Sequence, residues 1–176
     1  MVITRRAVLT YIHETREDET LMIHRNKPGD FLFDTFVAPG GGIEYGEKPF
    51  EAAYRETKEE TGLNLINLVY RGTVLFDNGT MPTSGGKKGN QSVDIFCANS
   101  FYGDQLSVSE SGPLVWVPNH EVGERSGSNG GDLIYDWLTD GRLFDARIIK
   151  RGGGVESSDV DWTSEFEVPE NPYKPS

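Results

Sequence analysis

The sequence predicts a single α/β domain. Apolar runs rich in β-branched residues, typical of strands, are interspersed with two segments whose apolar residues recur at helical spacing. The chain has 176 residues, about the length of one domain, and its glycines and prolines cluster between these runs as turn residues do. The only cysteine, Cys97, lies within an apolar run, where we expect a buried structural thiol rather than a reactive one. Because no disulfide can form within the chain, a reducing, cytoplasmic setting is favoured.

The first part of the chain predicts a β-hairpin followed by loops. The apolar runs at 7–12 and 20–24 flank a charged stretch that we expect to form a solvated turn. A Pro-Gly pair at 28–29 and the PGGG run at 39–42 indicate turns, and the aromatic segment between them is expected to be extended. A helix is predicted to follow the second turn.

The second half of the chain predicts three strands and one further helix. In the segment 132–139 the apolar residues form one stripe of a helix, and Gly141 follows as a C-terminal signal. The strands are expected over 65–76, 92–98 and 114–117, the last of them ended by a proline.

The chain is expected to comprise a folded domain over residues 1–150 and a tail over residues 151–176. The tail is rich in glycine, serine and acidic residues, although Trp162 and Phe166 suggest that part of it packs on the domain or on a partner. The first apolar run of the chain is too short for a signal peptide or a membrane span. We therefore expect no association with a membrane.

The charge balance excludes one class of partner. The chain has 17 Lys+Arg and 28 Asp+Glu, a net charge of −11, so its surface should repel polyanions. Proteins that bind nucleic-acid polymers without sequence preference rely on a basic face. We therefore expect a small-molecule partner rather than a DNA or RNA polymer.

Three glutamates fall on one side of the first predicted helix, which begins near Lys48 and ends at Gly62. Glu56, Glu59 and Glu60 stand at positions i, i+3 and i+4, where like charges repel by about 0.2–0.5 kcal/mol per pair. A solvated acidic face is the alternative explanation. Here, however, neighbouring helix residues are small and the PGGG turn precedes the helix, so a ligand could approach closely.

A divalent cation would offset the repulsion among these three carboxylates. Hard cations such as Mg²⁺ bind carboxylate and carbonyl oxygens together with substrate phosphates and water. The backbone carbonyl of Gly40, in the PGGG turn, is a further candidate ligand. An anionic polyphosphate could then bind this acidic protein through the metal ions.

The segment 41–63 resembles the Nudix box, G-x5-E-x7-R-E-U-x-E-E-x-G-U, in which U is a bulky apolar residue. Every fixed position is present, and the one departure is Thr57 at the first U position. The resemblance implies the Nudix α/β/α sandwich, with a mixed β-sheet between helices. It also implies an enzyme, a pyrophosphohydrolase that uses Mg²⁺ or Mn²⁺ to cleave phosphoanhydride bonds. The matching positions are Gly41, Glu47, Arg55, Glu56, Glu59, Glu60, Gly62 and Leu63.

The resemblance also assigns roles within the box. Glu47 and Arg55 would form a structural ion pair that holds the loop against the helix. Glu56, Glu59 and Glu60 would be the catalytic metal ligands. In such a site, metal ions neutralise phosphate oxygens and lower the pKa of the attacking water.

Three residues outside the box are further candidates. Glu110 stands where MutT-like members often have one more carboxylate, which serves as ligand or base; the alternative is an ordinary loop acid. Arg25, at the end of the second predicted strand, stands where such relatives often hold a basic residue for the phosphates, and Lys27 is nearby.

The segment SESGPLVWVP and the final helix look like the MutT-like branch that hydrolyses 8-oxo-dGTP. In this branch, polar residues at the start of the final helix read the purine, and Asn129 and Asp132 stand at about that place. Asp132 suits a helix N-cap equally well. The expected reaction is Mg²⁺-dependent hydrolysis of an oxidised purine dNTP to the monophosphate and pyrophosphate.

Other Nudix activities remain open, namely hydrolysis of ADP-ribose, of dinucleoside polyphosphates or of RNA 5′ ends. The proline typical of ADP-ribose hydrolases is replaced here by Asp77 and Asn78, and the tyrosine typical of dinucleoside-polyphosphate hydrolases by Gly79 and Thr80. A non-catalytic, nucleotide-sensing Nudix domain is a further alternative, but such domains usually lack box carboxylates that this chain retains. A homodimer is also compatible with the sequence.

Overall fold

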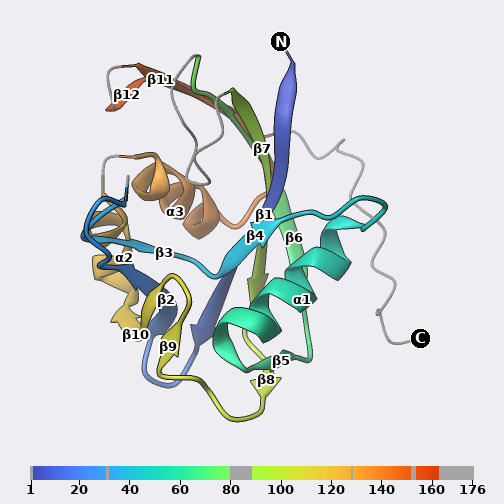
Figure 1. Cartoon of the computed structure of the whole chain (residues 1–176), viewed down its shortest axis with the longest axis vertical. Coiled ribbons are helices and arrows are strands. Elements are labelled where there is room, and N and C mark those ends of the chain that lie inside the picture. Colours follow the sequence, from blue (N-terminus) through green and yellow to red (C-terminus); the bar gives the residue numbers. More distant parts are fainter. Residues whose placement is uncertain (1, 31, 80–88, 128, 152–153, 163–176) are drawn as a thin grey trace.

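Among the residues that the structure describes, ten strands form one mixed β-sheet, and two short strands form a second (Figure 1). The computed structural model describes residues 2–30, 32–79, 89–127, 129–151 and 154–162. The elements are β1 (Ile3–Glu14), β2 (Glu19–Arg25), β3 (Thr35–Val37), β4 (Gly40–Gly42), α1 (Pro49–Thr61), β5 (Asn64–Leu65), β6 (Val69–Asp77), β7 (Asn90–Ala98), β8 (Phe101–Tyr102), β9 (Val108–Ser109), β10 (Gly112–Pro118), α2 (Asn119–Ser126), α3 (Gly131–Asp140), β11 (Phe144–Arg151) and β12 (Gly154–Asp161). The main sheet has the order β12-β11-β6-β7-β1-β2-β10-β9, with β3 beside β2 and β4 beside β1. The pairs β1–β7 and β6–β11 are parallel.

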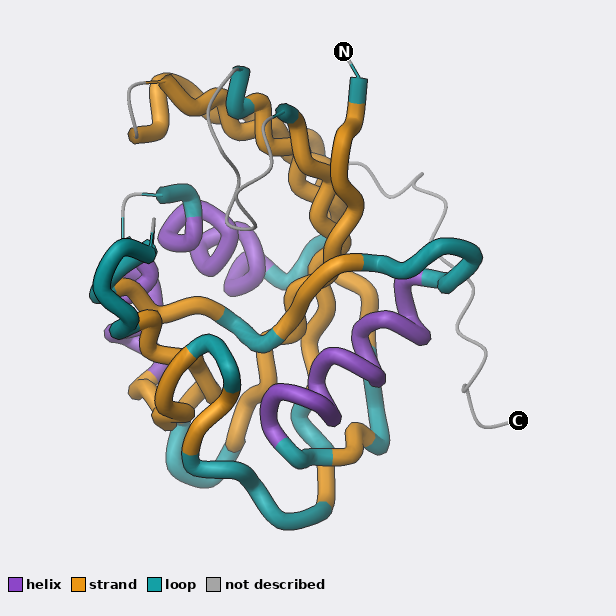
Figure 2. The backbone as a smooth tube through the Cα atoms, in the orientation of Figure 1, coloured by secondary structure: helices purple, strands orange, loops and turns teal. Residues whose placement is uncertain are grey.

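Helices lie on both faces of the main sheet, so the domain has three layers (Figures 1 and 2). Side chains alternate along β1 because successive strand residues point to opposite faces. Val8 and Ile12 join the apolar cluster beneath α1, whereas Ala7 and Tyr11 join the cluster beneath α2 and α3. This arrangement confirms the α/β/α sandwich that the resemblance implies.

Helix α1 begins and ends where the sequence predicts. Pro49 occupies its first turn, and the carboxylate of Glu51 accepts a hydrogen bond from the backbone N–H of Lys48 at 2.8 Å. At the other end Gly62 has a φ of 77°, and its N–H donates to the carbonyl of Lys58. These ends hold the three glutamates of the box in one rigid helix.

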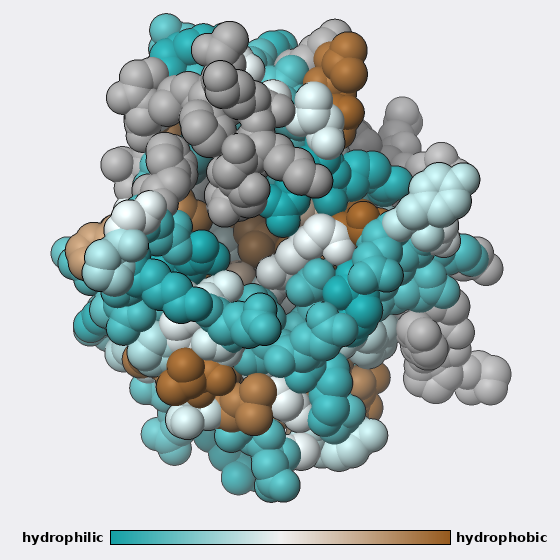
Figure 3. Space-filling model, in the orientation of Figure 1, coloured by the Kyte–Doolittle hydropathy of each residue, from teal (hydrophilic) through white to brown (hydrophobic). Residues whose placement is uncertain are grey.

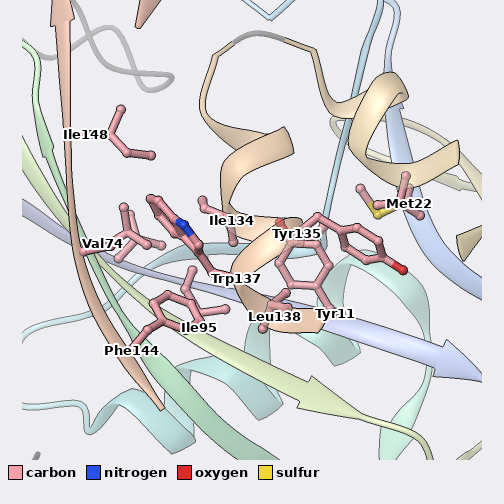
Figure 4. Packing of buried hydrophobic residues seen from close by; sticks show 14 of the residues in the cluster. Tyr11, Met22, Val74, Ile95, Ile134, Tyr135, Trp137, Leu138, Phe144 and Ile148 are labelled. Carbon is pink, nitrogen blue, oxygen red and sulfur yellow. The ribbon is translucent and has the colours of Figure 1, made fainter. Parts of the chain in front are cut away.

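Helix α3 packs into the centre of the opposite face (Figure 4). Trp137 lies 5.8 Å from the ring of Phe144 on β11, and Tyr135 lies 6.0 Å from the ring of Tyr11 on β1, centroid to centroid. Ile134 is 1% exposed within the same cluster. The apolar stripe predicted for residues 132–139 therefore anchors α3 to the sheet.

The sheet forks between β1 and β2. These strands pair directly only where 12–14 face 19–21. Beyond this point β4 pairs with residues 7–9 of β1, while β3 pairs with residues 23–25 of β2. The segment from β3 to β4 thus crosses the fork and leads into α1 (Figure 1). A cavity lies beside this crossing segment.

Two predicted segments need correction. The single strand expected over 65–76 is divided into β5, which pairs with β8 in the small second sheet, and β6, which lies in the main sheet. Helix α2 was not expected, since only Val122 in its sequence NHEVGERS is a large apolar residue and Pro118 resembles the end of a strand. No helix among the described residues is long and apolar enough to span a bilayer.

Part of the region that was assigned to the tail belongs to the main sheet. Strand β12 pairs antiparallel with β11, which itself extends to Arg151. Trp162 follows β12 and packs edge-on against Phe144, with ring centroids 6.2 Å apart, while the guanidinium of Arg142 lies over its ring. Phe166 lies outside the described residues. Residues 154–162 therefore add an edge strand and an aromatic contact to the domain.

Candidate active site

Arg55 ties the turn before α1 to the carboxylates on α1. Its Nε and Nη2 atoms donate to the two carboxylate oxygens of Glu47 at 2.7 and 2.8 Å, and Nη2 also donates to the carbonyl of Gly42 at 3.0 Å. Its Nη1 donates to Glu56 Oε1 at 2.8 Å and to Glu59 Oε2 at 3.3 Å. The hydrogen bonds between Arg55 and Glu47 lower the pKa of Glu47 and raise that of Arg55, so both groups remain charged.

Two glycines bring β4 against the carboxylate of Glu56. A Cβ atom at Gly41 would overlap that carboxylate, and a Cβ atom at Gly40 would overlap the backbone carbonyl of Val8. Only residues without a side chain can therefore occupy these positions without displacing a neighbour. The PGGG run, which was expected to form a turn, thus forms β4 at residues 40–42 and places backbone directly beside the acidic face of α1.

Glu60 projects from the last turn of α1 into a partly buried environment. Its Oε2 accepts a hydrogen bond from the backbone N–H of Gly40 at 2.8 Å, and the hydroxyl of Ser111 lies 3.4 Å from Oε1. Burial raises the pKa of Glu60 to about 7; the charge of Glu56 adds to this rise, and the bond from Gly40 opposes it. A positive charge beside Glu60 would therefore stabilise its ionised form.

The site suits a divalent cation that takes few ligands from the protein. Glu56 and Glu60 are near enough for their charges to interact. The side chain of Glu59 is 60% exposed and contacts Arg55. In the described part of the chain, no three acidic, histidine or cysteine side chains already surround one point. Because Mg²⁺ commonly binds one or two carboxylates and completes its shell with phosphates and water, Glu56 and Glu60 are the candidate pair of ligands.

A cavity of about 370 Å³ connects this acidic region with the start of α3. Gly40, Glu60 and Ser111 line the part nearest the box, and Leu9 and Ile134 are among the apolar residues of its walls. In the space-filling view, the centre of this face is hollowed, with hydrophobic surface inside and hydrophilic residues around it (Figure 3). The volume and the mixed lining are typical of a small-molecule site.

Comparison with known proteins identifies the family. The model of the NUDIX domain matches residues 3–138. The chain belongs to the Nudix family. It is 28% identical over 154 residues to the uncharacterized Nudix hydrolase YvcI of Bacillus subtilis (strain 168), across 86% of this chain and 84% of that protein.

Solved structures agree with this assignment of the chain as a Nudix hydrolase. The crystal structure of a mutator MutT protein from Bacillus halodurans matches with a TM-score of 0.75 and 26% identity, over 89% of this chain and 97% of that one. The dihydroneopterin triphosphate pyrophosphohydrolase of E. coli shares the fold, with a TM-score of 0.60 and 18% identity over 80% and 99% of the two chains. Nudix hydrolases act on nucleotide derivatives and generally use divalent metal ions. The predicted family is therefore confirmed, whereas the MutT-like 8-oxo-dGTP branch remains a prediction.

The Nudix domain places the basic candidate Arg25 in the cavity wall. Its side chain is 19% exposed, its Nε donates to Asp30 at 2.7 Å, and its charge acts on Glu60. The ammonium of Lys27 instead contacts the backbone carbonyl of Glu110. Glu110 itself is exposed in the turn between β9 and β10, and the adjacent Ser111 reaches the cavity in its place.

The two base-binding candidates occupy different surroundings. Asn129 lines the cavity. Asp132 lies in the first turn of α3 and lines a neighbouring surface depression with Tyr135. The N-cap of α3 is Gly130, so the interpretation of Asp132 as an N-cap is wrong. One carboxylate oxygen of Asp132 is buried without a hydrogen-bond partner among the described residues.

Ser111, Ser126 and Lys150 are among the cavity residues that the sequence did not identify as candidates. Ser111 and Ser126 carry no local signal. Lys150 does have a local signal, because buried residues alternate along β11. Phe144, Ala146 and Ile148 are buried, and Lys150 follows them on the same side of the strand. A lysine that continues the inward face of a strand indicates a polar cavity at that end of the sheet.

Proposed function

We propose that this Nudix hydrolase cleaves a nucleoside triphosphate, preferably an oxidised purine dNTP such as 8-oxo-dGTP, into the monophosphate and pyrophosphate. The observation that carries the proposal is one cavity that joins the carboxylate of Glu60 to a chamber at the start of α3, lined by Phe76, Ile134 and Lys150 among others. The charged phosphates would lie beside the box and the flat base in the chamber. The likeness to a mutator MutT protein supports the same substrate class.

The box residues would hold Mg²⁺ or Mn²⁺ through Glu56 and Glu60, with Glu59 and the carbonyl of Gly40 as further ligands. When bound, the ion neutralises phosphate charge and lowers the pKa of a coordinated water. Arg55 orients Glu56 by its hydrogen bond of 2.8 Å. The polar backbone N–H of Gly40 performs the same positioning for Glu60.

Residues outside the box would bind the rest of the substrate. Arg25 lines the cavity near Glu60 and is our candidate for phosphate contact. Asn129, at the cavity wall, and Asp132, in the first turn of α3, are our candidates for recognition of the base. Glu110 remains the proposed extra carboxylate, and its exposed position would require the β9–β10 turn to move toward the substrate.

The test is a panel of nucleotides incubated with Mg²⁺, in which kcat/KM is measured for each substrate. The panel contains 8-oxo-dGTP, dGTP, dATP, ADP-ribose, a dinucleoside tetraphosphate and a capped RNA fragment. We expect the highest kcat/KM with 8-oxo-dGTP. Faster turnover of ADP-ribose, the dinucleotide or the RNA would replace the proposed substrate, and no turnover by folded, metal-loaded protein would reject catalysis.

The variant Glu17→Gln controls for loss of one negative charge elsewhere on the protein. Glu17 is exposed in the turn between β1 and β2, away from the cavity lining. The activity of Glu17→Gln should equal that of the native chain, whereas Glu59→Gln should lower kcat/KM substantially. Equal activity of all three proteins would remove Glu59 from the proposed metal site.

A further inference from the structure

One residue of the cavity lining is a buried lysine that stands far from the Nudix box in the sequence. Lys150 is the last inward residue of β11 and is 9% exposed, and its ammonium lies 5.0 Å from the centroid of the Phe76 ring on β6. Both residues line the cavity. Lys150 also lies beyond residues 3–138, which the family model covers. Its role is therefore not assigned by the Nudix box or by the matched domain.

The start of α3 closes the end of the cavity where Lys150 lies. A Cβ atom at Gly130 would contact Phe76 and Ile148, so this turn packs directly on β6 and β11. The next residue, Gly131, lines the cavity and approaches Ser126. The Ser126 hydroxyl is buried in a residue 5% exposed, and it has no hydrogen-bond partner among the described residues. An ammonium and a serine hydroxyl thus line one chamber.

A buried lysine needs compensation for the water that it loses. Burial lowers the pKa of Lys150 to about 8, and the negative charge of Asp132 opposes this effect. Lys150 consequently remains largely protonated at neutral pH and can only donate hydrogen bonds. Asp132 lines a different depression, and its charge acts on Lys150.

The chamber suits a flat group with an acceptor on its edge better than a second phosphate. The apolar or aromatic residues Leu9, Tyr11, Phe76 and Ile134 line it. Among the described lining residues Lys150 carries the one ammonium, and the other cationic groups of the cavity are the guanidiniums of Arg5 and Arg25. A nucleobase has apolar faces and a polar edge, whereas a phosphate needs donors on several sides. An ammonium attracts a keto oxygen and repels an amino group, and this difference discriminates between bases.

We propose that Lys150 is a specificity-determining residue whose ammonium, assisted by the Ser126 hydroxyl, binds the keto oxygen of a 6-oxopurine and so disfavours 6-aminopurines. This inference rests on the proposed function, since it places the base of a nucleoside triphosphate in the chamber. Lys150 would contact the base from β11, a strand outside the segment that carries Asn129 and Asp132.

The test uses two substrates, dITP and dATP, which differ only in the groups at the 6-position and N1 of the purine. Native protein should favour dITP in kcat/KM. The variant Lys150→Met keeps an unbranched side chain and loses the donor, and it should reduce this preference by about tenfold or more, through a higher KM for dITP. Ser126→Ala should reduce it in the same direction by a smaller factor.

The matched control is Arg147→Met, which removes one positive charge from the outward side of β11, where Arg147 pairs with Asp77 at 2.7 Å. It should leave the dITP/dATP ratio unchanged. Binding of dIMP and dAMP without metal, measured by calorimetry, gives a readout that does not depend on catalysis. We expect Lys150→Met to weaken binding of dIMP and to leave that of dAMP nearly unaltered.

The outcomes separate the two proposals. If native protein hydrolyses nucleoside triphosphates and Lys150→Met changes both substrates by the same factor, Lys150 contacts phosphate or is structural, and the inference is overturned while the proposed function stands. If the native protein hydrolyses neither dITP nor dATP nor any triphosphate of the panel, both are overturned. A selective loss for dITP and dIMP supports the inference.

Discussion

The guanidinium of Arg55 holds both carboxylate oxygens of Glu47, with N–O distances of 2.7 and 2.8 Å. The side chains are 25% and 13% exposed, so water only partly screens the pair. The same guanidinium also donates to Glu56. One residue thereby stabilises the turn before α1 and orients a proposed metal ligand, which couples the stability of the domain to its activity.

Replacing Arg55 by lysine tests this coupling. Lysine keeps the charge but cannot donate in the planar, bidentate arrangement. We expect Arg55→Lys to lower the free energy of unfolding by about 2 kcal/mol and kcat/KM by about 10–100-fold. Urea denaturation and steady-state kinetics measure the two effects. The control Arg125→Lys alters an exposed pair with Glu121 and should cost less than about 1 kcal/mol; an equal cost for both variants would contradict the special role of Arg55.

Replacing Gly41 by alanine tests the contact between β4 and the acidic face of α1. The new Cβ would overlap the carboxylate of Glu56 and force that ligand to move. We expect Gly41→Ala to lower kcat/KM by about a hundredfold or more, because a misplaced ligand loses transition-state stabilisation. The matched control is Gly123→Ala in α2, where a Cβ meets nothing within 4 Å and alanine favours the helix. Activity of Gly41→Ala close to that of Gly123→Ala would show that Glu56 need not stay in place.

The elements that the sequence predicts correctly are those whose ends or faces are marked by nearby residues. Pro49 and Gly62 mark the ends of α1 in the sequence, and the structure places them there. Helix α2 has no such signal, because Val122 alone cannot define a period, and its contacts with α3 and β3 hold it in place. The edge strand β12 has a Gly/Ser/acid-rich sequence and is formed by pairing with β11 rather than by its own apolar pattern.

The candidate site likewise has residues that the sequence predicts and residues that it does not. Glu56, Glu59 and Glu60 are neighbours on one helix, so spacing alone brings them together. Ser111 reaches the cavity from the β9–β10 turn and Lys150 from β11, and only the packing of distant segments determines that they share it with Glu60. The sequence also could not distinguish Glu110 from Ser111, because the side chain that points inward depends on the geometry of the β9–β10 turn.

The metal-free protein should lose stability as the pH rises. The pKa of Glu60 is raised from its ordinary value of 4.5 to about 7 by burial, so the folded state keeps this proton to a higher pH than the unfolded chain does. The associated stability is fully present below about pH 4.5 and is lost as the pH rises through about 7. The loss is on the order of 3 kcal/mol. Urea denaturation in a chelator at pH 5 and pH 8 measures it.

The variant Glu60→Gln isolates the contribution of this carboxylate. Glutamine keeps the shape of the side chain and does not titrate, so the stability difference between variant and native protein should grow in favour of the variant from pH 5 to pH 8. Its kcat/KM should fall by about a hundredfold or more. A stability difference that does not change with pH would mean that Glu60 ionises normally in the fold.

Cys97 should be inert in the native protein. Burial raises the pKa of its thiol to about 12, so almost no thiolate is present at pH 8. We expect iodoacetamide to leave the folded protein unmodified and to alkylate Cys97 fully in denaturant, as read by mass spectrometry. Rapid alkylation of the folded protein at a rate typical of exposed thiols would contradict the structural role.

The most direct test of the central claim is the identity of the product released from a nucleoside triphosphate with and without Mg²⁺. The native chain and Glu60→Gln are incubated with 8-oxo-dGTP, and nucleotide, pyrophosphate and orthophosphate are quantified over time. The metal-dependent Nudix reaction predicts equal amounts of monophosphate and pyrophosphate, only with Mg²⁺, and formed at least about a hundredfold more slowly by Glu60→Gln. Release of orthophosphate with the diphosphate, or cleavage that persists in chelator, would contradict it.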